Sequence, residues 1–327
     1  MTSRYCSFAS SDPALLLFLS TLMFSPVAAI AQATPVPVAE AAQAQAVGEA
    51  WWTGPLIASS AETLPRDHVL VEPYLFNVRA GNSDYIGSLT YLLYGATDNL
   101  TLGFIPTFGA SRPDHAKPRG SVGIGDLTVS AQYRLHHSAP GAIVPSISLV
   151  AQRIVPLGRF DRLQGKPETG IGSGTATTLV GVYFQRIDRI ASGRPLRTRV
   201  NLTHTFGARV ALRDDSVYGT SSGFRGSAGV GAVTVFDLSI EYSLSRRLVI
   251  ASDFNYRHTG SIAVLGNAAD PTSYRADIAA TSSFSFAPAI EYSWAVDRGA
   301  LIGVRVTPRH NGSSTSWTPV VAFNAYF

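Results

Sequence analysis

Segments in which apolar and polar residues alternate recur about every twenty residues from His68 to the end of the chain. In residues 283–293, for example, the odd positions are small or polar, whereas the even positions are mostly aromatic or aliphatic. Successive side chains of a β-strand point to opposite faces, so this period of two predicts strands with one apolar and one polar face. The pattern predicts an all-β protein with about twelve strands, at residues 68–79, 85–96, 99–109, 122–135, 143–155, 176–187, 197–209, 231–243, 247–258, 281–293, 300–309 and 316–327.

The connections between these segments fall into two classes that alternate along the chain. Three connections of the second class run to about twenty residues, whereas none of the first class does. A closed membrane barrel gathers short turns at one end and longer loops at the other, and a stack of β-sandwich domains has no reason to do so. The sequence therefore predicts an antiparallel transmembrane β-barrel with short periplasmic turns and longer outer loops. The expected turns are 97–98, 136–142, 188–196, 244–246 and 294–299, and the expected outer loops are 80–84, 110–121, 156–175, 210–230, 259–280 and 310–315.

Composition agrees with a membrane barrel and excludes two other classes of protein. Charged residues make up only 15% of the chain, below the usual fraction of about a quarter. No apolar run after the N-terminus is long enough for a membrane-spanning helix, which excludes a helical membrane protein. The net charge of +4 comes from scattered arginines rather than a basic run, so nucleic acid is not an expected partner. The anionic lipopolysaccharide of an outer membrane is the expected partner of arginines in outer loops.

The first residues have the three parts of a secretory signal peptide, which we place at residues 1–31. Arg4 supplies the positive charge and residues 15–24 supply the apolar stretch. Small residues then offer cleavage after Ala31 or after Ala33. Export from the cytoplasm agrees with a location in the outer membrane of a Gram-negative bacterium.

We expect two further parts after the signal peptide. Residues 32–66 are predicted to form a periplasmic N-terminal tail, and residues 67–327 the outer-membrane barrel. The paired Trp51 and Trp52 either cap the periplasmic end of the barrel or anchor the tail at the membrane interface. Cys6 is the one cysteine of the sequence and belongs to the signal peptide, so the mature chain is expected to lack disulfides and thiol chemistry.

The last strand resembles the terminal strand of outer-membrane barrels. Trp317, Phe323 and Phe327 share one face of this alternating stretch. On an edge strand of a soluble protein, an apolar face of this kind is an aggregation hazard. In a membrane barrel the same face meets lipid, and the last aromatic residue lies in an interfacial girdle. We predict that Phe323, Tyr326 and Phe327 form a signal for the barrel assembly machinery.

Charged residues within the predicted strands must face the lumen, because hydrocarbon excludes unpaired charge. Two interpretations remain open for them. The charges either pair across neighbouring strands, as Glu241 with Arg257, and close the barrel, or they line a water-filled path and select among solutes. The candidate lumen-lining residues are Glu72, Asp126, Arg134, Asp237, Glu241, Asp253, Arg257, Glu291 and Arg305.

Enzyme chemistry has weak support in the sequence. His258 with Ser261, and His310 with Ser313, are the close histidine–serine pairs near the predicted rims, where a hydrolase site would lie. The adjacent pair His136-His137 lies in a predicted turn without nearby acids, so a metal site is not expected there. We predict no catalytic residues, no cofactor and no metal.

One segment resembles a known family of outer-membrane proteins. Gly123-Ile-Gly-Asp126, continued by the strand to Arg134, is similar to a motif of the family named for the meta-pathway of phenol degradation. The stretches 63–65 and 72–76 and the C-terminal strand are also similar to that family. The resemblance covers residues 51–327 and implies an outer-membrane transporter in a β-barrel fold. It supplies no solute-binding residues.

These observations predict a channel for the passive uptake of small solutes, with aromatic or otherwise hydrophobic compounds as candidates. The long outer loops would narrow or gate a charged lumen. A barrel of this size can also be filled by its own side chains, so a non-conducting structural or surface-interaction barrel is the alternative. A hydrolase at the rim is the third hypothesis.

Overall fold

The computed structural model describes residues 50–327 apart from 82, 113–121, 140, 167–168, 191, 270–272 and 310–313. The expected signal peptide and the first part of the expected tail lie outside these residues. Within the described part of the chain, no helix is long and apolar enough to cross a membrane.

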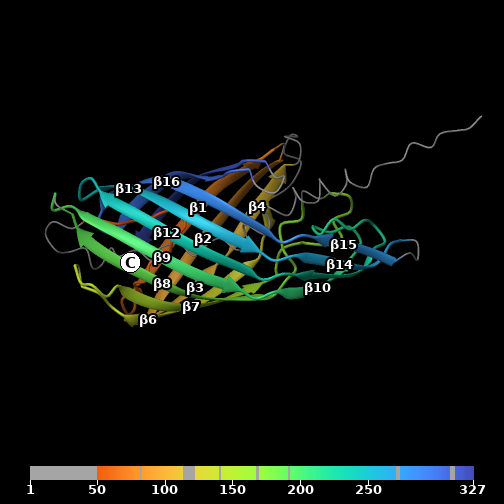
Figure 1. The fold of residues 1–327 in the computed structure, drawn as a ribbon, viewed down its shortest axis with the longest axis horizontal. Coiled ribbons are helices and arrows are strands. Elements are labelled where there is room, and N and C mark those ends of the chain that lie inside the picture. The colour runs from red at the N-terminus through yellow and green to blue at the C-terminus, as the bar shows by residue number, and fades with distance from the viewer. Residues whose placement is uncertain are drawn as a thin grey trace, which may run out of the picture.

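The wall of the molecule is a closed antiparallel β-barrel (Figure 1). Its sheet contains 14 strand segments, but β3 and β4 are halves of one wall strand, as are β5 and β6, so 14 − 2 gives the twelve strands predicted. β1 pairs with both β2 and β18, which closes the barrel. The wall strands are β1 (Val69–Ala80), β2 (Ser83–Thr97), β3 (Leu100–Ile105), β4 (Thr107–Arg112), β5 (Gly123–Ile124), β6 (Leu127–His136), β7 (Ser146–Val155), β8 (Thr177–Arg189), β9 (Pro195–Thr205), β12 (Val233–Ser243), β13 (Leu248–Thr259), β16 (Thr281–Ala295), β17 (Arg298–Thr307) and β18 (Ser316–Tyr326).

Local chemistry explains the two interrupted wall strands. Pro106 separates β3 from β4, and proline has no N–H to give to a strand ladder. Gly125 and Asp126 separate β5 from β6. Residues 69 and 326 lie at the same end of the barrel, which we call the terminal end, and the opposite end is called the extension end.

At the extension end, four strands continue beyond the barrel as a second sheet (Figure 1). It comprises β10 (Ala208–Arg213), β11 (Arg225–Val230), β14 (Ile262–Asn267) and β15 (Ser273–Ile278), in that order. Residues 210–230 and 259–280, which the sequence analysis assigned to outer loops, therefore consist largely of two β-hairpins. The prediction of loops there was wrong because short breaks in the alternation hid its continuation.

Glycines form the bend between the barrel and this extension sheet. Gly207, Gly231 and Gly260 interrupt the wall strands at neighbouring positions. A Cβ atom on Gly231 would lie 2.6 Å from the backbone carbon of Gly260. The close approach of these backbones requires glycine. After the bend, the buried positions change from odd to even numbers, as from Thr205 to Val210.

The two faces of the wall differ as the alternation predicts. Outward positions such as Phe254, Phe284 and Ile302 carry large exposed apolar side chains. Inward positions carry small, polar or charged side chains, many of them fully buried, with an apolar cluster on the side of β1 and β2. The barrel is therefore apolar outside and largely polar inside, the reverse of a soluble domain.

Candidate functional site: the lumen and the segment that crosses it

Residues 50–65, which we call the lumen segment, run through the inside of the barrel. Every residue from Trp52 to Leu64 is buried. The prediction of a periplasmic tail at residues 32–66 was therefore wrong for residues 50–65. The segment belongs to no strand, and side chains of the wall satisfy its backbone instead.

Two wall carboxylates hold the first half of the lumen segment. The backbone N–H groups of Thr53 and Gly54 each donate to Glu291 Oε2 at 2.9 Å. Those of Leu56 and Ala58 donate to the two oxygens of Asp253, at 2.9 and 3.0 Å. Four donors of the segment backbone thus bind two side chains of the wall, so these two acids fix the course of the segment.

Amides, hydroxyls and a guanidinium of the wall bind the carbonyls that follow. Arg199 Nη1 donates to the Ala58 carbonyl at 3.1 Å, and Asn201 Nδ2 donates to the Ser59 carbonyl at 3.1 Å. Gln132 Nε2 donates to the Ser60 carbonyl at 3.0 Å, and Ser148 Oγ to the Ala61 carbonyl at 2.5 Å. These donors come from β9, β6 and β7. Wall strands far apart in the sequence therefore contact successive residues of the segment.

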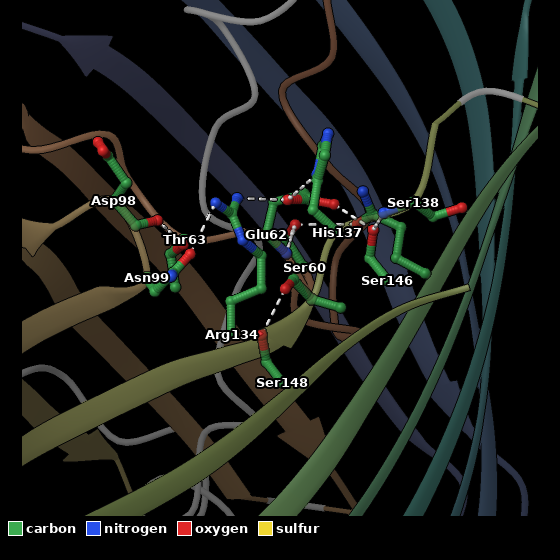
Figure 2. A network of polar contacts seen from close by, with 12 residues as sticks. Ser60, Glu62, Thr63, Asp98, Asn99, Arg134, His137, Ser138, Ser146 and Ser148 are labelled. Atoms are coloured by element: carbon green, nitrogen blue, oxygen red, sulfur yellow. Dashed lines mark hydrogen bonds and ion pairs between the residues drawn. The ribbon is translucent and has the colours of Figure 1, made fainter. Parts of the chain in front are cut away.

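Glu62 forms the densest polar contact between the segment and the wall (Figure 2). Arg134 Nη1 lies 2.7 Å from Glu62 Oε2, and His137 Nδ1 lies 3.0 Å from the same oxygen. Ser146 donates its hydroxyl to the other oxygen, Oε1. Arg134 is thus bound by the segment rather than open to solutes. The turn with His136-His137 was predicted to have no nearby acid, and the buried segment brings one there.

The segment leaves the lumen at the terminal end. Thr63 Oγ1 donates to the Asp98 carbonyl at 2.6 Å, and the Leu64 N–H donates to Thr101 Oγ1 at 2.8 Å. A Cβ atom on Gly95 would lie 2.0 Å from the Pro65 carbonyl oxygen. Gly95 therefore leaves the space through which the chain passes from the lumen to β1.

A buried triad of charges lies beside the start of the segment. Glu241 Oε1 lies 2.9 Å from Arg199 Nε and accepts a hydrogen bond of 2.9 Å from Arg197 Nε. All three side chains are fully buried. The Trp52 ring lies 4.3 Å from the Arg197 guanidinium carbon, a cation–π contact. The suggested pairing of Glu241 with Arg257 was wrong, because Glu241 stands directly opposite Arg197 in the register of β9 and β12.

The two tryptophans thus have different surroundings. Trp52 is buried on Arg197 inside the barrel. Trp51 is half-buried at the terminal end, where its backbone N–H donates to the Arg246 carbonyl at 2.7 Å. Its ring lies 5.6 Å from the Arg247 guanidinium carbon. Trp51 therefore packs against the turn before β13 at the terminal end, and its role as a cap or an interfacial anchor stays a prediction.

Asp126 fixes a loop at the extension end. Its two carboxylate oxygens accept the Gly158 N–H at 3.1 Å and the Ser173 N–H at 2.8 Å, and Ser173 Oγ donates at 2.6 Å. Ile171 of the same loop packs with Tyr85 of the wall. The loop of residues 156–175 is thereby fastened to the wall at this end.

Three of the predicted charges lie in the lumen towards the extension end. Arg305 donates through Nε to Ser285 Oγ at 2.9 Å and through Nη2 to Asn255 Oδ1 at 3.0 Å. Asn255 Nδ2 donates to Asp237. Arg257 Nε donates to Thr259 Oγ1 at 3.3 Å. Two arginines and one aspartate leave a net charge of +1 in this region.

All nine predicted charges face inward, with distinct surroundings. Glu291, Asp253 and Arg134 bind the lumen segment, whereas Asp126 binds a loop. Glu72 is buried beside Tyr74, whose hydroxyl lies 3.4 Å from Glu72 Oε1. Their part in solute passage stays a prediction.

Three charged residues of this site were missed by the sequence analysis. The inward position of Arg197 and Arg199 could have been predicted, because they alternate with outward residues just as Asn201 does. Glu62 had no such signal, since the segment that carries it lacks a strand pattern.

The remaining candidates are dispersed. His258 Nδ1 lies 2.9 Å from Ser282 Oγ on β16, whereas His310 and Ser313 lie outside the described residues. No group of acidic residues, histidines and cysteines arranged to hold a metal occurs in the described part of the chain.

The three residues of the predicted assembly signal do not share one face. Phe323 and Phe327 point outward with 52% and 63% exposure, but Tyr326 is buried and stacks on His68.

Comparison with known proteins places the architecture among outer-membrane barrels. No protein-family model and no curated protein matches the chain. The fold is similar to that of the COG4313 outer membrane channel from Pseudomonas putida F1, with a TM-score of 0.57, 14% identity, and coverage of 82% of this chain and 98% of that one. The NanC porin (TM-score 0.45, 9% identity, 78% and 98% coverage) and the KdgM porin (0.41, 10%, 77% and 98%) are more distant in structure. At these identities the comparison establishes the β-barrel fold.

Proposed function

We propose that this protein is an outer-membrane channel for the passive uptake of small solutes, and that its lumen segment controls passage. The observation that carries the proposal is a closed barrel with an apolar exterior and an interior rich in charged and polar side chains. An apolar belt fits lipid, whereas buried charges along the axis fit a path for polar solutes.

In this proposal, the terminal end faces the periplasm and the extension end faces outward. The shorter connections lie at the terminal end, and the fastened loop and the extension sheet lie at the other. This arrangement is the usual one for bacterial outer-membrane barrels. The outward Phe323 and Phe327 fit recognition by the barrel assembly machinery, whereas Tyr326 would act from the lumen side.

The lumen segment explains how passage would be controlled. It is tied to the wall mainly by side-chain hydrogen bonds rather than by a strand ladder. Such a segment can leave the lumen without breaking the pairing of any wall strand. A gap opens where it withdraws, and the exposed lumen carboxylates and arginines then become hydrated.

The class of solute follows from the family resemblance and from the side chains that line the lumen. The resemblance of residues 51–327 to the phenol-degradation meta-pathway family implies transport, with aromatic or otherwise hydrophobic compounds as candidates. Aromatic and aliphatic side chains on the β1 and β2 side of the lumen fit such compounds, and Phe76, Tyr85 and Leu89 are among them. A polar solute would instead follow the side of β13 and β17, where Arg257 and Arg305 lie.

A non-conducting structural barrel is the rival function. The complete burial of residues 52–64 favours it, because a lumen filled in this way leaves no path while the segment stays in place. We propose no catalytic activity and no cofactor, since His258 pairs with Ser282 on the outer face rather than forming a triad with an acid.

Conductance of the refolded chain, residues 34–327, in a planar bilayer tests the proposal. Discrete openings in a salt gradient are expected. A folded, heat-modifiable protein that never conducts, even after the lumen segment is loosened, would instead support the structural barrel.

A further inference from the structure

The outer face of the extension sheet carries a group of arginines that the channel function does not use. Arg209, Arg213, Arg225 and Arg275 are all exposed on this face, together with Asp277. Four positive charges and one negative charge leave a net charge of +3. Arg275 is paired with Asp277 at 2.7 Å. The other three arginines form no ion pair with the described residues, and we call them the arginine face.

The opposite face of the same sheet is apolar and covered. Val210, Leu212 and Val264 are buried there against Tyr218 and Phe224 of the connecting segment. The arginines therefore lie on the side that points away from this packed layer. This face has no partner within the described residues.

Two of the arginines stand directly opposite each other. Arg213 and Arg225 are Cα partners in the antiparallel register of β10 and β11. Like charges in such a position destabilise a sheet. The acids beside these strands bind backbone groups, since Asp161 accepts the Arg213 N–H and Asp214 accepts the Gly223 N–H, and neither forms an ion pair with the Arg213 or Arg225 guanidinium within the described residues. An anion bridging the two guanidinium groups would relieve the repulsion.

The position of the arginine face selects the kind of anion. β10 continues β9 after a short break, and the outward residues Leu202 of β9 and Phe206 just after it are exposed and apolar. Arg209 follows Phe206 by three residues, or about 10 Å along an extended chain. In the orientation proposed above, Leu202 and Phe206 lie in the outer leaflet. The arginine face then begins at the depth of the lipid headgroups.

We propose that the arginine face binds the phosphates of lipopolysaccharide in the outer leaflet. Guanidinium groups bind phosphate through paired, charge-assisted hydrogen bonds. Contact would neutralise the Arg213–Arg225 pair and hold the extension sheet against the headgroup layer. The inference rests on the proposed outer-membrane orientation and is separate from the ability to conduct.

The test compares two variants with equal changes of charge. One is Arg209→Gln/Arg213→Gln/Arg225→Gln, and the control is Arg66→Gln/Arg194→Gln/Arg298→Gln, whose arginines are exposed at the terminal end. Each protein is refolded in zwitterionic detergent and titrated with fluorescent lipopolysaccharide. The arginine-face variant is expected to bind about tenfold more weakly or worse, and the control to stay within about twofold of the unchanged protein. Equal binding by the two variants would overturn the proposal.

Two further arms identify the ligand. Dephosphorylated lipopolysaccharide is expected to bind the unchanged protein as weakly as intact lipopolysaccharide binds the arginine-face variant. Inorganic phosphate, at the same phosphate concentration, is expected not to displace lipopolysaccharide, and displacement would assign the site to free anions instead. Heat modifiability shows that each variant is folded. Conductance in phosphatidylethanolamine/phosphatidylglycerol bilayers is recorded separately, so that a failure of the channel does not count against lipid binding.

Discussion

At the scale of single residues, a few buried carboxyl groups hold the lumen segment in place inside the barrel. Asp253 gives both of its oxygens to backbone N–H groups of the lumen segment. Asp237, two strand positions away across the β12–β13 pair, is equally buried but bonds to Asn255 of the wall. The two acids therefore differ in whether they hold the segment, which makes them a matched pair for testing.

Replacement of Asp253 by asparagine should loosen the lumen segment. An amide keeps one acceptor oxygen but turns an N–H group towards the Leu56 or Ala58 amide, so one hydrogen bond is lost and a buried backbone N–H is left without an acceptor. An unsatisfied buried donor costs about 1–3 kcal/mol, which corresponds to about a fivefold or greater rise in open probability. Single-channel recording provides the measurement. Asp237→Asn is the control, and an equal rise in both variants would count against a role of Asp253 in holding the segment.

Replacement of Asp126 by asparagine should loosen the loop of residues 156–175. The Gly158 or Ser173 amide then loses its acceptor, and local opening becomes easier. Trypsin cleavage after Arg159 or Arg162 should accelerate by about tenfold, since one hydrogen bond to a charged group is lost. Mass spectrometry of the fragments locates the cuts. Asp188→Asn at the terminal end is the control, and unchanged cleavage in Asp126→Asn would refute the anchoring role.

At the scale of elements, the wall strands and the lumen segment differ in what binds their backbones. All twelve wall strands could be predicted, because lipid on one side and a polar interior on the other impose a period of two on every strand. The lumen segment could not be predicted, because its backbone partners are side chains as far as 238 positions away, as in the Thr53–Glu291 bond. The Glu62 contacts and the pairing of Glu241 depend on that segment and on strand register, so they were missed too.

Deletion of residues 52–62 should leave the barrel folded and widen the path through its lumen. The wall closes through β1, β2 and β18 without any strand contact from the segment. Water would then hydrate Asp253, Glu291 and the Glu241 triad. Heat-modifiable migration should be retained while the mean conductance increases. Loss of heat modifiability would show instead that the segment is required for the barrel to form.

At the scale of the whole molecule, charge is distributed unevenly along the lumen. The lumen segment covers Glu291, Asp253 and Arg134, whereas Arg257 and Arg305 lie with Asp237 towards the extension end. A solute that enters along β12, β13 and β17 would therefore first meet a local net charge of +1, which favours anions on that side, whereas Asp126 lies beside β6.

Arg257→Gln should shift the ion selectivity of the channel towards cations, because it removes the excess positive charge of that region. The reversal potential in a salt gradient measures the shift. Arg153→Gln is the control, since Arg153 points outward and donates to Thr178 at 2.8 Å. An unchanged reversal potential in Arg257→Gln would place the ion path elsewhere.

A reversible lock on the lumen segment tests the central claim most directly. A Cβ atom at Gly299 would lie 2.2 Å from Thr53 Cγ2, so cysteines at these positions are within reach of a disulfide. The measurement is the conductance of Thr53→Cys/Gly299→Cys in residues 34–327, before and after reduction, with each single-cysteine variant as control. We predict a silent barrel when the disulfide is formed and discrete openings after reduction. Equal conductance in both states would contradict control by the segment, and silence in both, with the single-cysteine variants also silent, would contradict the channel itself.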